Sequence, residues 1–217
     1  KLQKGSHDKW KELRRALSGR TTMSTRDLHE LVQKHVAVQT TYAIRKLTQD
    51  GTLEKIALGR RGLYAVRGNG SKAGFLRDPL EVIRSTYGEE MYYCYGTALY
   101  LLGLSRYGRI SSYCLGSTIA RNQRTFGQFA VRVIKTPVGK GLGVKRHKIG
   151  DHTVSITDTE RTILDCLHKP KYAEGWENVL HALTKIKRID EMRILNYAKQ
   201  YRIPSLAGKL GVVLEHL

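Results

Sequence analysis

Two amphipathic segments separated by a very short turn constrain this chain more than any other feature. Ser24 precedes Asp27 by three residues, the spacing of a helix N-cap, and apolar residues then recur at helical intervals through Val36. A second segment begins at Thr40, which is placed to cap it, and stops at Gly51, a residue that suits a left-handed C-cap. Two helices joined in this way predict a helix-turn-helix.

The flanking residues extend this pattern to a winged helix-turn-helix. Residues 8–17 place Trp10 on the same face as two leucines and predict a preceding helix. The apolar runs at 53–58 and 63–66, with a Gly-Arg-Arg-Gly connection between them, predict a two-stranded hairpin. We interpret this hairpin as the wing.

The rest of the chain predicts a second, mixed domain. Residues 67–74 have the composition of a linker, and strand-like alternation between 111 and 157 is followed by helical patterns to the end. We therefore expect an α+β protein with a winged helix-turn-helix over residues 1–70. A C-terminal domain with a small β-sheet and a helical end would occupy residues 75–217.

The charge balance favours a polyanionic partner. Lys and Arg number 38 against 19 Asp and Glu, a formal net charge of +19, and basic residues outnumber acidic ones on both sides of Gly70. Nucleic acid is the leading candidate because it attracts such a surface electrostatically. The alternative is a basic surface that only keeps the protein soluble.

The outward face of the helix expected after Thr40 carries side chains that can read double-stranded DNA. Arg pairs with guanine, Gln pairs with adenine, and Thr bonds to phosphates, while the docking geometry places the N-terminal half of such a helix in the major groove. The alternative is a solvated helix face and a charged hairpin tip. The predicted DNA contacts are Gln39, Thr40, Thr41, Tyr42, Arg45 and Lys46, with Arg60 and Arg61 at the wing tip.

A second basic segment lies among glycines in the C-terminal part. It lacks the residue order of a phosphate-binding P-loop, since Gly139-Lys140 is followed by Gly141. It is either a secondary contact to nucleic acid or a partner, or a plain solvated loop. The residues concerned are Lys140, Lys145, Arg146 and Lys148.

Carboxylates gather locally only near residue 158, where Asp151, Asp158, Glu160 and Asp165 occur. Their spacing suits stabilisation of a helix N-terminus and a pairing with Arg161 better than metal binding. We therefore expect no catalytic residue, no metal site and no cofactor.

The cysteines and the hydropathy pattern indicate a cytoplasmic protein. Cys94, Cys114 and Cys166 are odd in number and widely spaced, so neither a disulfide framework nor a zinc site is expected. No run approaches the ~20 apolar residues that cross a bilayer, and no signal sequence opens the chain.

Three passages resemble the AbiEi family, the antitoxins of type IV toxin-antitoxin and phage-defence modules. The first is Thr40-Thr41-Tyr42-Ala43-Ile44-Arg45-Lys46-Leu47. The second is Tyr95-Gly96-Thr97-Ala98-Leu99-Tyr100-Leu101-Leu102-Gly103-Leu104. The third and most specific is Ile156-Thr157-Asp158-Thr159-Glu160-Arg161-Thr162-Ile163-Leu164-Asp165, followed by Pro170-Lys171-Tyr172-Ala173-Glu174-Gly175.

The resemblance implies a transcriptional repressor of its own operon that binds inverted repeats near the promoter. It also implies a C-terminal domain that counteracts a cognate nucleotidyltransferase toxin without a stable complex. Two alternatives stand beside it. One is a stand-alone winged-helix transcription factor with a sensing or partner-binding domain, and the other is a metal-dependent enzyme acting on nucleic acid through the acidic residues near Asp158.

Overall fold

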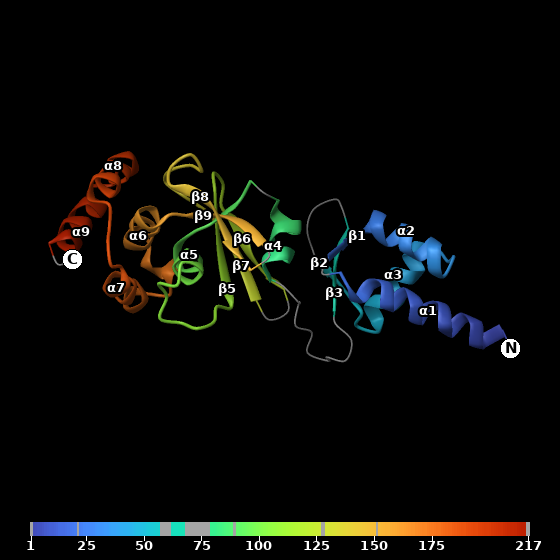
Figure 1. Ribbon diagram of the computed structural model, residues 1–217. Helices are drawn as coiled ribbons and strands as arrows, with labels where there is room; N and C mark the ends of the chain where they lie inside the picture. Colours follow the sequence, from blue (N-terminus) through green and yellow to red (C-terminus); the bar gives the residue numbers. More distant parts are fainter. Residues whose placement is uncertain are drawn as a thin grey trace. The chain divides into compact units, whose positions relative to one another are not determined.

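The computed structural model describes most of the chain and resolves it into two compact units (Figure 1). The described ranges are 2–20, 22–56, 62–67, 79–88, 90–126, 129–150 and 152–215. One unit comprises Lys1–Gly88 with Phe126–Gln128, and the other comprises Glu89–Thr125 with Phe129–Leu217. Within these ranges the chain forms nine α-helices and two β-sheets, so the predicted α+β class is confirmed.

The first unit packs three helices beside a small antiparallel sheet. Its strands lie in the order β1-β3-β2, and β3 pairs with both neighbours. Strand β1 was not expected from the sequence because three residues are too few to show alternation. The elements are α1 (Leu2–Ser18), β1 (Thr22–Ser24), α2 (Thr25–His35), α3 (Thr40–Gln49), β2 (Leu53–Ile56), β3 (Leu63–Val66) and α4 (Pro79–Tyr87).

The helix starts agree with the sequence at one position and differ at another. Ser24 caps α2 in a reciprocal capping box, in which its hydroxyl accepts from the backbone N–H of Asp27 and the Asp27 carboxylate accepts from the N–H of Ser24. The expectation that Thr40 caps α3 is wrong. Gln39 is the N-cap residue and Thr40 is the first helical residue, because its hydroxyl bonds to the His29 ring instead of the helix end.

The units divide after Gly88, whereas the sequence suggested a boundary between residues 70 and 75. The expected linker lies almost wholly outside the described residues. Helix α4 belongs to the first unit because it packs beside β1, where the hydroxyls of Thr22 and Ser85 lie 2.9 Å apart.

The second unit is built on a six-stranded mixed sheet with the order β6-β7-β5-β4-β9-β8. Helices α5 to α9 lie together on one side of this sheet (Figure 1). Strands β4 and β5 run antiparallel, whereas β4 and β9 run parallel. The elements are β4 (Tyr92–Tyr93), α5 (Tyr95–Leu101), β5 (Ser112–Ser117), β6 (Arg121–Phe126), β7 (Phe129–Lys135), β8 (Val144–Ile149), β9 (His152–Thr157), α6 (Thr159–His168), η1 (Pro170–Ala173), α7 (Trp176–Lys185), α8 (Glu191–Tyr201) and α9 (Pro204–Leu214).

The core between this sheet and its helices contains all three cysteines as free, buried thiols. Burial raises the pKa of Cys114 to about 12 and raises the pKa of Cys94 and Cys166 as well, so all three thiols stay protonated at neutral pH. In the described ranges, no helix combines the length and apolar character that crossing a membrane requires.

Candidate nucleic-acid interface

Helix α3 is held at a fixed angle to α2 by a short turn. The backbone N–H groups of Val36 and Ala37 both donate to the carbonyl of Val32 at 2.9 Å, and Ala37 adopts a left-handed conformation with φ of 52°. The Gln33 amide donates to the carbonyl of Val38 at 3.0 Å and closes the turn from the side. The arrangement fixes which face of α3 points away from the core.

One face of α3 is buried and the opposite face is open. Ala43 and Leu47 are fully buried, whereas Thr41 and Arg45, one helical turn apart, are exposed. Arg45 makes no hydrogen bond or ion pair with any residue that the structure describes. Its guanidinium therefore keeps all five donors for an external acceptor.

The start of α3 offers a second kind of contact. Gln39 is exposed and its side chain makes no capping hydrogen bond. The backbone N–H groups of the first turn consequently have no side-chain acceptor at the cap position, and the helix dipole favours an anion there. Thr40 is half-buried beside His29, with the hydroxyl oxygen 2.7 Å from Nδ1 of the ring.

Trp10 of α1 supports two of the predicted contact residues. The Nζ atom of Lys46 lies 4.1 Å from the centre of the indole ring, and the Tyr42 ring meets the indole edge-on at 6.4 Å between ring centres. Tyr42 is 55% exposed although it leans on a buried tryptophan. Lys46, half-buried, thus lies on the flank of α3 that faces α1 rather than on its open face.

The C-terminal end of α3 also contacts α1. Arg14 donates to the carboxylate of Asp50, the C-cap residue of α3, at 2.6 Å. Burial alone would raise the pKa of Asp50, but the hydrogen bonds from Arg14 and Thr52 hold that pKa below its ordinary value. Helix α1 thus contacts α3 near both ends.

The structure describes the base of the hairpin that we interpret as the wing. Arg67 donates to the Glu54 carboxylate at 2.8 Å and links the strand ends of β2 and β3. Arg60 and Arg61, the predicted contacts at the tip, lie outside the described residues.

The second basic segment does not form one surface. Lys145, Arg146 and Lys148 are exposed on β8, an edge strand that pairs only with β9 among the described strands. Since side chains alternate along a strand, Arg146 and Lys148 share one side and Lys145 points to the other. Lys140 is exposed in the turn before β8.

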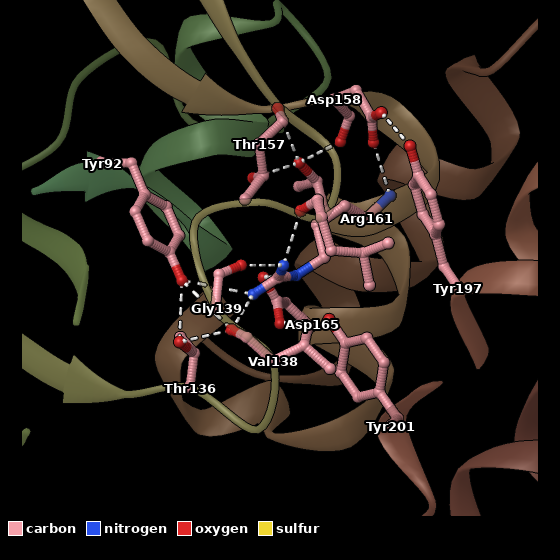
Figure 2. Close-up of polar contacts among 12 residues, drawn as sticks. Tyr92, Thr136, Val138, Gly139, Thr157, Asp158, Arg161, Asp165, Tyr197 and Tyr201 are labelled. Carbon is pink, nitrogen blue, oxygen red and sulfur yellow. Dashed lines mark hydrogen bonds and ion pairs between the residues drawn. The ribbon is translucent and has the colours of Figure 1, made fainter. Parts of the chain in front are cut away.

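A fully buried arginine holds that turn in place. Arg161 belongs to α6, and its side chain lies at the centre of the polar cluster in Figure 2, beside the connection from β7 to β8. Its guanidinium forms a buried ion pair with Asp165, in which Nε lies 3.1 Å from the carboxylate. It also donates to the Tyr92 hydroxyl and to the backbone carbonyls of Val138, Gly139 and Leu142.

The carboxylates near residue 158 have structural partners. Asp158 caps α6 by accepting from the N–H of Arg161 at 2.8 Å. Asp158 also accepts from the Tyr197 hydroxyl, while Asp165 accepts from the Tyr201 hydroxyl at 2.6 Å. Glu160 accepts from the backbone N–H of Asp190 at 3.1 Å.

These contacts leave few carboxylate oxygens to bind a metal ion. Over the described ranges, which omit Asp151, no group of three or more His, Cys, Asp or Glu side chains is arranged to bind an ion. The polar cluster of Figure 2 therefore serves to join the β7 to β8 connection, α6 and α8. Nothing in the sequence pointed to Trp10 as a support for α3, or to Tyr92 and the loop carbonyls as partners of Arg161, because these contacts join distant segments.

The comparisons with known proteins inform the fold. No protein-family model matches the chain, and no curated protein matches it. Among solved structures, the chain is similar to the crystal structure of the RV2827C protein from Mycobacterium tuberculosis, with a TM-score of 0.70 and 15% sequence identity. The alignment covers 93% of this chain and 75% of that one. At this identity, the similarity shows a shared fold and no more.

Proposed function

We propose that this chain is a sequence-specific DNA-binding regulator that reads the major groove with α3 of an N-terminal winged helix-turn-helix. The observation that carries the proposal is the open face of α3. Thr41 and Arg45 lie exposed one turn apart on a helix whose opposite face is buried and whose orientation is set by the turn after α2.

The chemistry of this face suits base recognition. Arg45 has an unused planar set of donors, and a bidentate contact from arginine to guanine contributes about 1–3 kcal/mol of discrimination. The uncapped first turn of α3 suits a phosphate, which would set the register of the helix on the duplex. A net charge of +19 adds non-specific attraction to DNA.

We extend the proposal to an autorepressor and antitoxin of the AbiEi type, without enzymatic activity of its own and acting in the cytoplasm. The resemblance of the three sequence passages supports this extension. The regulator would bind inverted repeats near its own promoter and counteract a nucleotidyltransferase toxin without a stable complex. Free, buried cysteines suit a reducing compartment.

A titration of the full chain tests the DNA proposal. The chain is mixed with a labelled duplex from the region upstream of its gene, and with a random duplex of equal length, at two salt concentrations. We expect tighter binding to the upstream duplex by a factor of about 10³ or more, with affinity for both duplexes falling as salt rises. Equal affinities would leave only generic charge attraction and would contradict the proposal.

Co-expression tests the antitoxin extension separately. A nucleotidyltransferase encoded next to this gene is expressed with or without the chain, and growth is followed. Rescue of growth by the chain supports the antitoxin role. Specific operator binding without rescue favours the stand-alone transcription factor.

Strand β8 supports a secondary contact to nucleic acid. Arg146 and Lys148 share one side of an exposed edge strand, and Lys140 lies in the turn that Arg161 holds. Because such a contact involves phosphates only, replacing Arg146 and Lys148 with Gln would weaken binding to specific and random duplexes equally. Unchanged binding to both duplexes would mean that β8 makes no contact with nucleic acid.

A further inference from the structure

The basic side chains of the first unit differ in the groups that they contact. Arg14 and Arg67 each pair with a carboxylate, at 2.6 Å and 2.8 Å, so their charges are neutralised locally. Lys46 lies instead over the face of Trp10 at 4.1 Å and has no carboxylate partner among the residues that the structure describes. An aromatic ring is thus the principal support of this ammonium group.

Contact with an aromatic ring leaves the positive charge of Lys46 available to an external anion. An indole ring attracts a cation through its quadrupole but carries no net charge, so it orients the ammonium without cancelling it. An ammonium group has three donors, and those directed away from the ring remain open to another acceptor. Because Trp10 is only 6% exposed and its ring is fixed by packing, it offers a rigid platform.

The Trp10 ring contacts only one flank of α3 among the described residues. Tyr42 and Lys46 are one helical turn apart, and both contact the Trp10 ring. Arg45 follows a different line along the helix, with Thr41, on the open face. Helix α3 therefore has a flank supported by α1 and a separate, unsupported open face.

We propose that Trp10 is a positioning residue that holds Lys46 for a DNA phosphate. Helix α3 is then divided into a phosphate-contacting flank of Tyr42 and Lys46 and a base-reading face of Thr41 and Arg45. The inference rests on the proposed function, since it assigns roles within the same interface. It removes Tyr42 and Lys46 from the predicted base readers and adds a residue of another helix to the determinants of binding.

The salt dependence of binding separates the two roles. Each phosphate neutralised by a lysine contributes about 0.9 to the slope of log affinity against log salt concentration. A phosphate contact is shared by all sequences, so its loss lowers affinity for specific and random duplexes by the same factor. Loss of a base reader lowers the ratio between the two affinities.

The experiment uses the full chain and the two duplexes above, with anisotropy titrations between about 50 and 200 mM salt. Lys46→Gln should reduce the slope by about 0.9 on both duplexes and leave the specificity ratio unchanged. Trp10→Leu keeps apolar packing without the ring and should reduce the slope toward the Lys46→Gln value. Trp10→Phe keeps an aromatic ring and should retain most of the wild-type slope. Lys199→Gln, which removes one exposed charge from α8, is the matched control and should change neither quantity.

A double mutant makes the test decisive. If Trp10 acts through Lys46, combining Trp10→Leu with Lys46→Gln should be no worse than Lys46→Gln alone. Additive losses, an unchanged slope in Trp10→Leu, or a fall in the specificity ratio would each overturn the inference. Urea unfolding of every variant reports folding, and if Trp10→Leu does not fold, the same double-mutant comparison is made with Trp10→Met, which also fills apolar space without an aromatic ring.

The two proposals fail differently. Equal binding of wild-type chain to both duplexes contradicts the DNA-reading function as a whole. A retained specificity ratio in wild type together with additive Trp10 and Lys46 losses contradicts only the positioning role.

Discussion

Arg45 on α3 and Arg161 on α6 use the same side chain in opposite ways. Arg161 is fully buried and donates to Asp165, to Tyr92 and to three backbone carbonyls, whereas Arg45 is exposed and donates to no residue that the structure describes. In a chain with 38 basic and 19 acidic residues, one-to-one pairing leaves half of the cations without a carboxylate. Burying one requires many converging acceptors, so exposed and unpaired arginines are the ones left for an external anion.

The largest expected effect is the loss of the buried arginine. Arg161→Met removes the partner of Asp165 and leaves a buried charge, so we expect the second unit to be destabilised by about 3–5 kcal/mol. Urea unfolding of the full chain measures this. A loss below about 1 kcal/mol would mean that the cluster of Figure 2 contributes no more than a surface ion pair.

A glycine beside the same cluster gives the next effect. Gly143 has a φ of 63°, and an added Cβ would lie 2.8 Å from Cβ of Arg161 and 2.9 Å from the Tyr197 ring. We expect Gly143→Ala to cost about 1–3 kcal/mol through backbone strain and crowding. Gly141→Ala is the matched control, because a Cβ there meets nothing within 4 Å. Similar melting temperatures for the two variants would contradict the close packing around Arg161.

The corresponding change on α3 should affect binding and leave folding intact. Arg45→Ala should reduce affinity for the specific duplex by about 1–3 kcal/mol more than affinity for random duplex, without a change in unfolding midpoint. Replacing Arg60 and Arg61 with Ala should weaken binding to both duplexes. Equal losses on both duplexes for Arg45→Ala would remove α3 as the reading helix.

The smallest effect concerns the ion pair between α1 and α3. The pKa of Asp50 is lowered by the hydrogen bonds from Arg14 and Thr52, so the pair stabilises the fold above the ordinary Asp pKa. That stabilisation is lost as pH falls through the lowered value in the folded state. Both side chains are about one-third exposed, so we expect Asp50→Asn to cost only about 0.5 kcal/mol at pH 7. Thermal melts at pH 7 and in acid check this, and a stability difference between variant and wild type that persists in acid would contradict it.

Local signals predicted much of the fold. The N-cap at Ser24, the buried face of α3 with Ala43 and Leu47, and the left-handed Gly51 depend on neighbours within a few residues, and the structure contains each of them. The cap of α3 was predicted at Thr40, one residue away from its true position at Gln39. Adjacent polar residues can both serve as caps, and tertiary contacts decide between them, as His29 does for Thr40.

The sequence by itself determined the α+β class, the basic character, and the exposed and buried faces of α3, because periodicity and composition act locally. Only the tertiary structure decided that Trp10 supports Lys46 and that Arg161 binds a loop about 20 residues away and a tyrosine 69 residues away. The physical reason is that a cation is stabilised by whatever acceptors or rings surround it in space. Those neighbours come from segments whose proximity no local pattern encodes.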